Sequence, residues 1–184
     1  MIMAKEYLVV TAVGPDRRGI VEKITDVVHR YRANIEESRM ARLGGEFAVI
    51  MLVSVPGEQE EAFVEGLGTL KADPLTEQLT IFTRPTNLSR LEKFKGFVPY
   101  EISVVGADHE GIVHYVARYL AEERVQIESM ETRTYPAPVS GVPIFSMQAL
   151  IQAPPELTLP VLRHKLGELA DELGVDIEVK VPTG

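Results

Sequence analysis

The stretch Val13-Gly14-Pro15-Asp16-Arg17-Arg18-Gly19-Ile20-Val21 decides the fold, because an apolar run ends and a helical pattern begins within it. The pattern returns as Val105-Gly106-Ala107-Asp108-His109-Glu110-Gly111-Ile112-Val113, 92 residues further along the chain. Each copy predicts a junction between a β-strand and a helix. We therefore expect the functional site at these two turns.

Each turn has two glycines and an aspartate, and the helix start that follows them suits a small anion. The first glycine permits a backbone turn that a Cβ atom would crowd. The aspartate is a predicted N-cap, and the second glycine leaves room for a ligand. Free N–H groups at a helix start favour an anion such as the carboxylate of an amino acid. A capped turn that binds no ligand is the alternative interpretation. The residues are Gly14, Asp16 and Gly19 in the first turn and Gly106, Asp108 and Gly111 in the second.

The composition of the 184-residue chain is that of a soluble globular protein of one domain or two small ones, with 45% apolar and 25% charged residues. No apolar run reaches the length of about 18 residues that a membrane span needs, and the N-terminus lacks the features of a signal peptide. The chain has no cysteine, which excludes disulfides and thiol chemistry. These features predict a cytoplasmic protein.

The net charge of −8 argues against direct nucleic-acid binding, which normally uses a basic face. Regulation of transcription through contact with another protein stays compatible with this charge.

The first half of the chain predicts a strand, a helix, two strands, a helix and a strand. β-Branched and apolar runs favour the strands, apolar residues at helical spacing favour the helices, and Gly44-Gly45 is typical of a hairpin turn. The predicted elements are a strand at 7–13, a helix at 17–32, strands at 35–43 and 46–55, a weaker helix at 58–70 and a strand at 75–83. The buried face of the first helix is predicted to hold Ile20, Val21, Ile24, Val27, Val28 and Tyr31.

The second half repeats this order, which indicates an internal duplication. Gln126-Ile127-Glu128 takes the place that Asn34-Ile35-Glu36 has in the first half. The second hairpin is longer, and residues 135–143 are predicted to form its loop because they contain prolines and a glycine. Strands are predicted at 100–105, 144–151 and 175–181, and helices from about 112 and at 159–173.

The order βαββαβ in both halves predicts an α+β protein of two tandem ferredoxin-like domains, with antiparallel sheets and helices on one face. The predicted domains are residues 1–84 and 98–184, joined by a basic linker at 85–97. We expect this linker to be a solvated connector rather than a contact for an acidic partner.

A βαββαβ unit with this glycine-containing first turn resembles the ACT domain. The residues that carry the resemblance are Gly14-Pro15-Asp16-Arg17-Arg18-Gly19-Ile20-Val21, followed by Asn34-Ile35. Two such units without a further domain resemble the glycine cleavage system transcriptional repressor family and its tandem-ACT relatives.

The resemblance implies amino-acid binding where the first turn of one unit meets the second strand of another. Asn34 offers both donors and an acceptor, and Arg18 favours a carboxylate. Glu110 would repel a carboxylate, so the first site is the better candidate. The implied ligand-binding residues are Gly14, Asp16, Arg18, Gly19, Asn34 and Ile35 in the first site, and Gly106, Asp108, Gly111, Gln126 and Ile127 in the second.

From the resemblance we expect a non-catalytic amino-acid sensor that modulates a transcriptional regulator of glycine or one-carbon metabolism through protein contact. Glycine or serine is the expected ligand, and a homodimer or an intramolecular ACT pair is the expected assembly. The alternatives are a detached regulatory subunit of an amino-acid pathway enzyme and an interaction module without a ligand.

No catalytic, cofactor or metal site is predicted. His109 and His114 lie five residues apart, whereas two histidines of a zinc helix lie four apart on one face. No membrane contact and no nucleophile triad are expected either.

Overall fold

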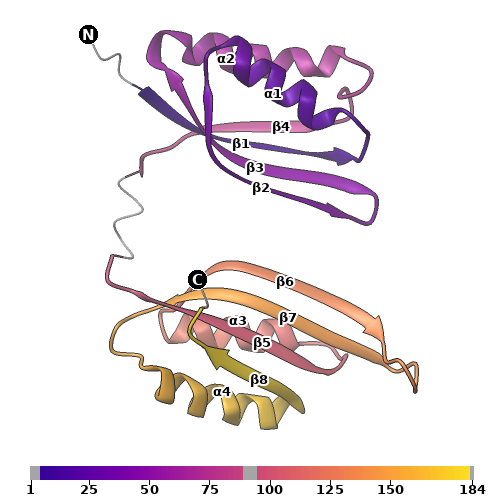
Figure 1. Ribbon diagram of the computed structural model, residues 1–184, viewed down its shortest axis with the longest axis vertical. Coiled ribbons are helices and arrows are strands. Elements are labelled where there is room, and N and C mark those ends of the chain that lie inside the picture. The colour runs from indigo at the N-terminus through magenta and orange to yellow at the C-terminus, as the bar shows by residue number, and fades with distance from the viewer. Residues whose placement is uncertain (1–4, 89–94, 183–184) are drawn as a thin grey trace. The chain divides into compact units, whose positions relative to one another are not determined.

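The computed structural model describes residues 5–88 and 95–182, and it divides into two compact units, Met1–Arg90 and Leu91–Gly184 (Figure 1). Each unit has the element order βαββαβ, so the predicted tandem ferredoxin-like α+β fold is confirmed. The boundaries predicted at 84 and 98 stay predictions. Residues 89–94, the middle of the predicted linker, lie outside the described residues.

The first unit is a four-stranded antiparallel sheet in the order β2-β3-β1-β4, with both α-helices on one face (Figure 1). Its elements are β1 Lys5–Pro15, α1 Ile20–Arg30, β2 Asn34–Leu43, β3 Glu46–Pro56, α2 Glu60–Gly68 and β4 Thr80–Pro85. Short 3-10 helices, Gly57–Gln59 and Thr69–Ala72, flank α2.

The second unit repeats this sheet in the order β6-β7-β5-β8. Its α4 has the predicted bounds, with Pro160 in the first turn and Gly174 left-handed at its C-terminal end. The elements are β5 Val98–Ala107, α3 Ile112–Glu122, β6 Gln126–Pro136, β7 Pro143–Ala153, α4 Leu159–Leu173 and β8 Val175–Lys180.

The core of the first unit lies between the sheet and its helices. Alternate residues of β1 point toward the helices, as period-2 strand geometry requires. On α1, Ile24 is buried but Val21 is 47% exposed, so the prediction that Val21 packs inward was wrong. A helix face can bury only about 100° of its circumference against one sheet, and Val21 lies beyond it. Residues buried in this core include Leu8, Val10, Ala12, Ile24 and Phe63.

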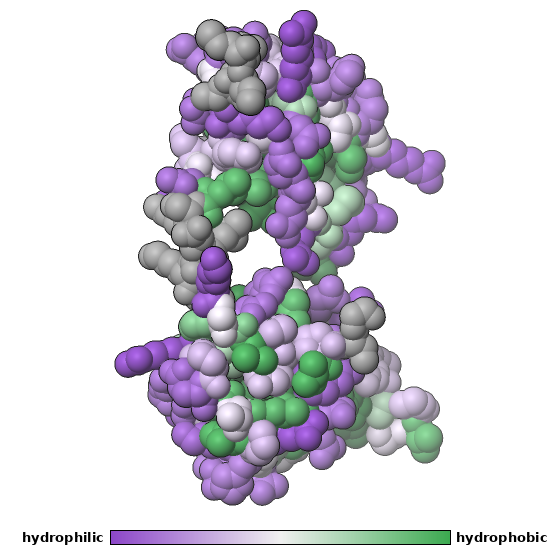
Figure 2. All heavy atoms as spheres, turned by 60° about the vertical axis from the view of Figure 1, so that its left-hand side comes forward, coloured by the Kyte–Doolittle hydropathy of each residue, from purple (hydrophilic) through white to green (hydrophobic). Residues whose placement is uncertain are grey.

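The opposite face of the first sheet has no helix, and apolar side chains reach the surface there. Ile50 of β3 is 50% exposed and Phe82 of β4 is 61% exposed. Apolar residues appear among polar ones on the surface of both units in the view of Figure 2. β3 is therefore a strand with neighbours on both sides in the sheet, but the helices of its unit cover only one of its faces.

The last strand of the first unit begins later than predicted, at residue 80 instead of 75. The buried Thr76 hydroxyl donates to the Leu70 carbonyl at 2.7 Å, and the Asp73 carbonyl accepts from the Thr76 and Glu77 N–H groups. These bonds hold residues 73–78 in turns, because their backbone groups have partners outside the sheet.

Candidate functional site

Gly14 lies inside β1, paired with Phe47 of β3, and is not the turn residue that we predicted. A Cβ atom at this position would come within 2.8 Å of the Gln78 carbonyl oxygen. In the second unit, a Cβ atom on Gly106 would come within 2.6 Å of the Val175 side chain. Both glycines are therefore needed because the segment that enters the last strand passes close to them.

The second glycine of each turn adopts the special backbone conformation. Gly19 and Gly111 have φ angles of 95° and 96° and stand at the N-cap positions of α1 and α3. No side chain in the described part of the chain caps either helix, so the prediction that Asp16 and Asp108 are N-caps was wrong. The glycine takes the N-cap position three residues after the aspartate, which leaves the aspartate outside the helix start.

Asp16 is instead paired with Arg42 at the far end of β2. The Arg42 Nε atom lies 2.6 Å from a carboxylate oxygen of Asp16, and the Asp16 N–H donates to the Gly45 carbonyl at 2.9 Å. These contacts tie the first turn to the β2–β3 hairpin. Sequence reasoning missed Arg42, because the pair depends on sheet register.

The two arginines of the first turn have different environments. Arg17 donates to the Pro74 carbonyl at 2.8 Å and to the Gln78 side chain at 3.1 Å, which fixes the turn to the segment before β4. Arg18 is exposed and has no hydrogen-bond or ion-pair partner among the residues that the structure describes. Its guanidinium therefore remains available to a ligand beside the uncapped start of α1.

The second turn has the opposite charge character. His109 replaces Arg17, and its Nε2 atom lies 2.8 Å from the Leu173 carbonyl while Nδ1 lies 3.0 Å from the Glu110 carbonyl. These contacts raise the pKa of His109, with the Glu110 carbonyl the largest cause and Asp108 adding a charge contribution. Glu110 stands at the position of Arg18, so the turn lacks an arginine to attract a carboxylate.

The start of β2 forms a compact polar cluster around Glu36. The Ser54 hydroxyl donates to a Glu36 carboxylate oxygen at 2.5 Å, and Lys5 lies 3.7 Å from the same oxygen. The Ser54 hydroxyl, the Asn34 amide and Lys5 together lower the pKa of Glu36. Ile35, the other predicted site residue here, is half-buried against the core.

The start of β6 is arranged differently. The Gln126 Nε2 atom donates to the Ile127 carbonyl at 2.9 Å, and Gln152 donates to Glu128 at 3.0 Å. Ile127, like Ile35, packs against the core of its unit. The repeated motif Asn/Gln-Ile-Glu was a visible signal for Glu36 and Glu128, but we did not predict a site role for either.

The two parts of each predicted site lie at opposite ends of the sheet. Gly14 pairs with Phe47 of β3, whereas Asn34 pairs with Ser54. Seven strand positions separate these partners, which corresponds to about 23 Å. In the second unit the partners Phe145 and Gln152 have the same separation. The structure thus brings Gly14, Asp16, Arg18 and Gly19 together, but Asn34 and Ile35 lie apart from them within the unit.

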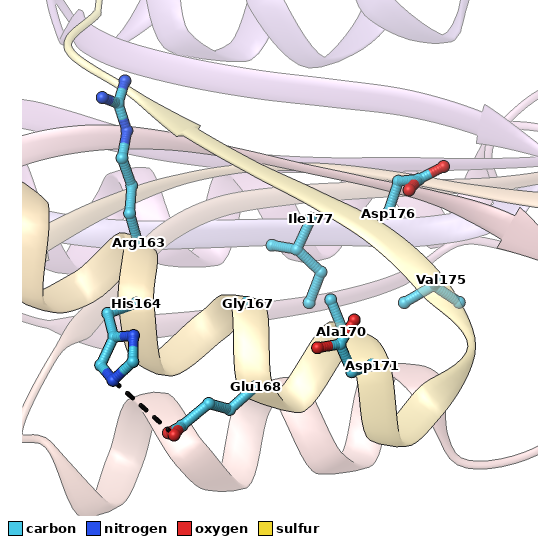
Figure 3. Close-up of a pocket in the computed structure, with 9 residues that line it drawn as sticks. All are labelled: Arg163, His164, Gly167, Glu168, Ala170, Asp171, Val175, Asp176 and Ile177. Atoms are coloured by element: carbon cyan, nitrogen blue, oxygen red, sulfur yellow. Dashed lines mark ion pairs between the residues drawn. The ribbon is translucent and has the colours of Figure 1, made fainter.

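A shallow hollow of about 490 Å³ lies between α4 and β8 (Figure 3). Its rim carries Glu168, Asp171 and Asp176, and the sticks show Glu168 paired with His164 at 3.7 Å. The hollow contains none of the predicted site residues. Arg163 and His164 also line it, but the three carboxylates outnumber them and disfavour the carboxylate of an amino acid, so size alone does not make it the ligand site.

The described residues contain no group of three or more His, Cys, Asp or Glu side chains arranged to hold a metal ion. Among the helices described by the structure, none has both the length and the apolar character needed to cross a membrane.

Comparisons of the chain with known proteins agree on one family. The ACT domain model matches residues 6–73. The chain is 30% identical to the glycine cleavage system transcriptional repressor of Escherichia coli (strain K12), over 98% of this chain and 92% of the relative. A crystal structure of an unknown protein from Galdieria sulphuraria has 34% identity and a TM-score of 0.82, covering 98% of this chain and all of that one. A crystal structure assigned to a glycine cleavage system transcriptional repressor has 23% identity and a TM-score of 0.68, with 96% of both chains covered, which supports the fold.

Proposed function

The chain belongs to the tandem ACT-domain family of the glycine cleavage system transcriptional repressor, and from this premise we propose that it is a non-catalytic regulatory protein that senses a small amino acid. Glycine or serine is the proposed ligand. The protein acts in the cytoplasm on a transcriptional regulator of glycine or one-carbon metabolism through protein contact. Its net charge of −8 supports a protein partner rather than direct nucleic-acid binding.

The observation that carries this proposal is the uncapped start of α1 beside Arg18. The first N–H groups of a helix lack partners within the helix, and no described side chain caps them here. They carry partial positive charge, which the helix dipole reinforces. Arg18 adds a full positive charge that no described residue neutralises. Together these groups suit the α-carboxylate of an amino acid.

The separation of the turn from Asn34 within a unit supports a complete site that takes its two parts from two units. We propose that the turn of one unit and the second strand of another, in the same chain or in a second copy, hold the two ends of the amino acid. The ligand then stabilises one pairing of units and shifts the population toward it. It does so only to the extent that it binds that pairing more tightly than the alternative.

Thermal unfolding with each of the twenty standard amino acids tests the proposal on the wild type, Arg18→Ala and Arg84→Ala. A ligand at 100 times its dissociation constant stabilises the folded protein by about 2.7 kcal/mol. We expect a rise with glycine or serine that is lost in Arg18→Ala and kept in Arg84→Ala, which removes an exposed arginine of β4. No rise with any amino acid at millimolar concentration would contradict the sensor and favour an interaction module without a ligand.

A further inference from the structure

The side of the first sheet that faces away from α1 and α2, here called the open face, has an apolar centre (Figure 1). Ile50 of β3 and Phe82 of β4 both lie opposite Thr11 of β1, so the three side chains share this face. They belong to one continuous apolar area across three neighbouring strands. The apolar side chains of the open face include Val9, Val13, Ile50, Leu52 and Phe82.

The second unit shows that this fold does not require an apolar open face. In the register of its sheet, Glu178 has the place that Phe82 has in the first sheet. Gln148 likewise has the place of Ile50, and both polar side chains are exposed. The first unit therefore does not need apolar residues at these positions in order to fold. An exposed apolar area that the fold does not require indicates a surface that another protein chain covers.

Two charges of opposite sign on β2 border the apolar centre. Glu37 lies opposite Leu52 and Arg39 lies opposite Ile50, so both charged side chains belong to the open face. Both are exposed, and the Arg39 Nη2 atom lies 3.3 Å from the Glu37 Oε1 atom. A two-fold axis that crosses the strands between these positions places Glu37 of one copy against Arg39 of the other, and the same contact occurs twice. The charges of the open face therefore complement a second copy of that face.

The size of the open face also suits a dimer. The strands β1, β2, β3 and β4 have 11, 10, 11 and 6 residues. At the usual rise per residue and strand spacing, they offer about 600 Å² per copy. Two copies would bury about 1,200 Å², which reaches the lower end of the range for specific interfaces. Under the same axis Arg84 of β4 lies over Phe82 of the other copy, where a cation and a ring attract each other.

We propose that a second copy of the chain covers the open face, so that two first sheets stack face to face in a dimer. Aligned sheets of this kind pack about 10 Å apart with their strands about 30° from each other. Ile50 and Phe82 lose their contact with water in the dimer, and Glu37 and Arg39 pair across it. The contact uses the side of the sheet opposite to α1, so it does not involve the helix start and requires no ligand.

Sedimentation velocity of the full chain from about 1 μM to about 1 mM tests the dimer, because an interface of this size can be weak. The test variant is Phe82→Glu, which copies Glu178 of the second unit and should therefore fold, as circular dichroism would check. The control is Met40→Glu. Met40 is as exposed as Phe82, but it lies opposite Val49 on the side of the sheet that faces the helices.

We expect the wild type and Met40→Glu to dimerise and Phe82→Glu to stay monomeric, because a buried carboxylate without a partner is costly. A wild type that is monomeric over the whole range would overturn the proposal. A folded Phe82→Glu chain that dimerises like the wild type would also overturn it, since the copies would then meet through another surface. If the proposal holds, Phe82→Glu also allows ligand effects to be measured without this contact.

Two charge reversals test the pairing of like faces. Glu37→Arg alone and Arg39→Glu alone each place like charges opposite each other in a dimer, so each should dimerise about tenfold more weakly than the wild type. An equal mixture of the two variants restores both opposite-charge contacts. We expect the mixture to dimerise about as well as the wild type. A mixture that dimerises no better than either variant alone would overturn the two-fold arrangement.

Discussion

At the residue scale, the first turn depends on glycines for two separate reasons. Gly14 lets the segment before β4 come close, since its Cβ position lies 2.8 Å from a backbone oxygen. Gly19 adopts a left-handed conformation that a side chain would strain. The motif therefore combines a packing requirement with a conformational one, although both appear in the sequence only as glycine.

Gly14→Ala should destabilise the first unit by about 1–3 kcal/mol, because the new methyl group displaces backbone rather than a flexible side chain. The measurement is urea unfolding of the full chain. Gly68→Ala is the control, since its Cβ position has no neighbour within 4 Å and its φ of −61° is helical. The control should be neutral or stabilise by up to about 1 kcal/mol. Equal effects of the two substitutions would show that the close approach to Gln78 is not the cause.

His109 predicts a pH-dependent stability of the second unit. Both ring nitrogens contact carbonyl oxygens, and an imidazole donates from both only when it is protonated. Because the folded-state pKa is raised, this contribution is fully present below the unfolded pKa of about 6.5 and is lost as the pH rises through the folded value.

Unfolding of the wild type and His109→Gln from pH 5.5 to 8.5 measures this dependence. We expect the stability of the second unit to fall above about pH 6.5 in the wild type and to change less in the variant, which cannot be protonated there. His164→Gln is the control, because His164 is an exposed histidine of α4 in the same unit. A slope that persists in His109→Gln but disappears in His164→Gln would assign the dependence to the other histidine.

At the element scale, the buried face of α1 differs from the predicted one, and two substitutions on this helix test the difference. Ile24 is 2% exposed and Val21 is 47% exposed. Ile24→Ala should cost about 2–5 kcal/mol, because it removes buried methyl groups and leaves a cavity. Val21→Ala should change the stability by less than about 0.5 kcal/mol, as exposed substitutions usually do. Comparable losses in denaturant unfolding would instead place both residues in the core.

The order of elements and their duplication could be predicted from the sequence, because hydrophobic period and turn residues are local signals. The bounds of α4 followed from its leucine spacing, Pro160 and Gly174. The role of Asp16 could not be predicted, because its partner Arg42 lies across the hairpin. The predicted start of β4 was wrong because hydrogen bonds of Thr76 to Leu70 and Asp73 hold this segment in turns, which its apolar residues do not reveal.

In the candidate site, too, some contacts could be predicted from the sequence and others could not. Gly19 and Arg18 belong to a local motif, and the structure places both at the turn before α1, whereas Gly14 lies inside β1. The Ser54 hydroxyl donates to Glu36, and only the sheet register reveals that Ser54 lies opposite Asn34. The spacing of residues along one strand does not reveal which residue of the neighbouring strand lies opposite.

At the scale of the whole molecule, the two units have separate hydrophobic cores. Ile24 and Phe63 belong to one cluster, whereas Met147 and Leu166 belong to the other, and the clusters share no residue among those described. Each core joins its own sheet to its own helices. The units therefore have the physical basis to unfold separately in the absence of ligand.

Leu166→Ala in the full chain tests this independence. Leu166 is fully buried, so its truncation should lower the stability of the second unit by about 2–5 kcal/mol while the first unit keeps its transition. Val161→Ala is the control, since Val161 is 42% exposed on the same helix. Calorimetry would show the two transitions moving apart, and a single transition that moves as a whole would show that the units unfold as one.

Repeating the scan with saturating glycine then distinguishes the two assemblies. If both units of one chain hold the ligand, the two transitions should merge at a temperature that does not depend on protein concentration. If two copies hold the ligand between them, the transition temperatures should change with protein concentration.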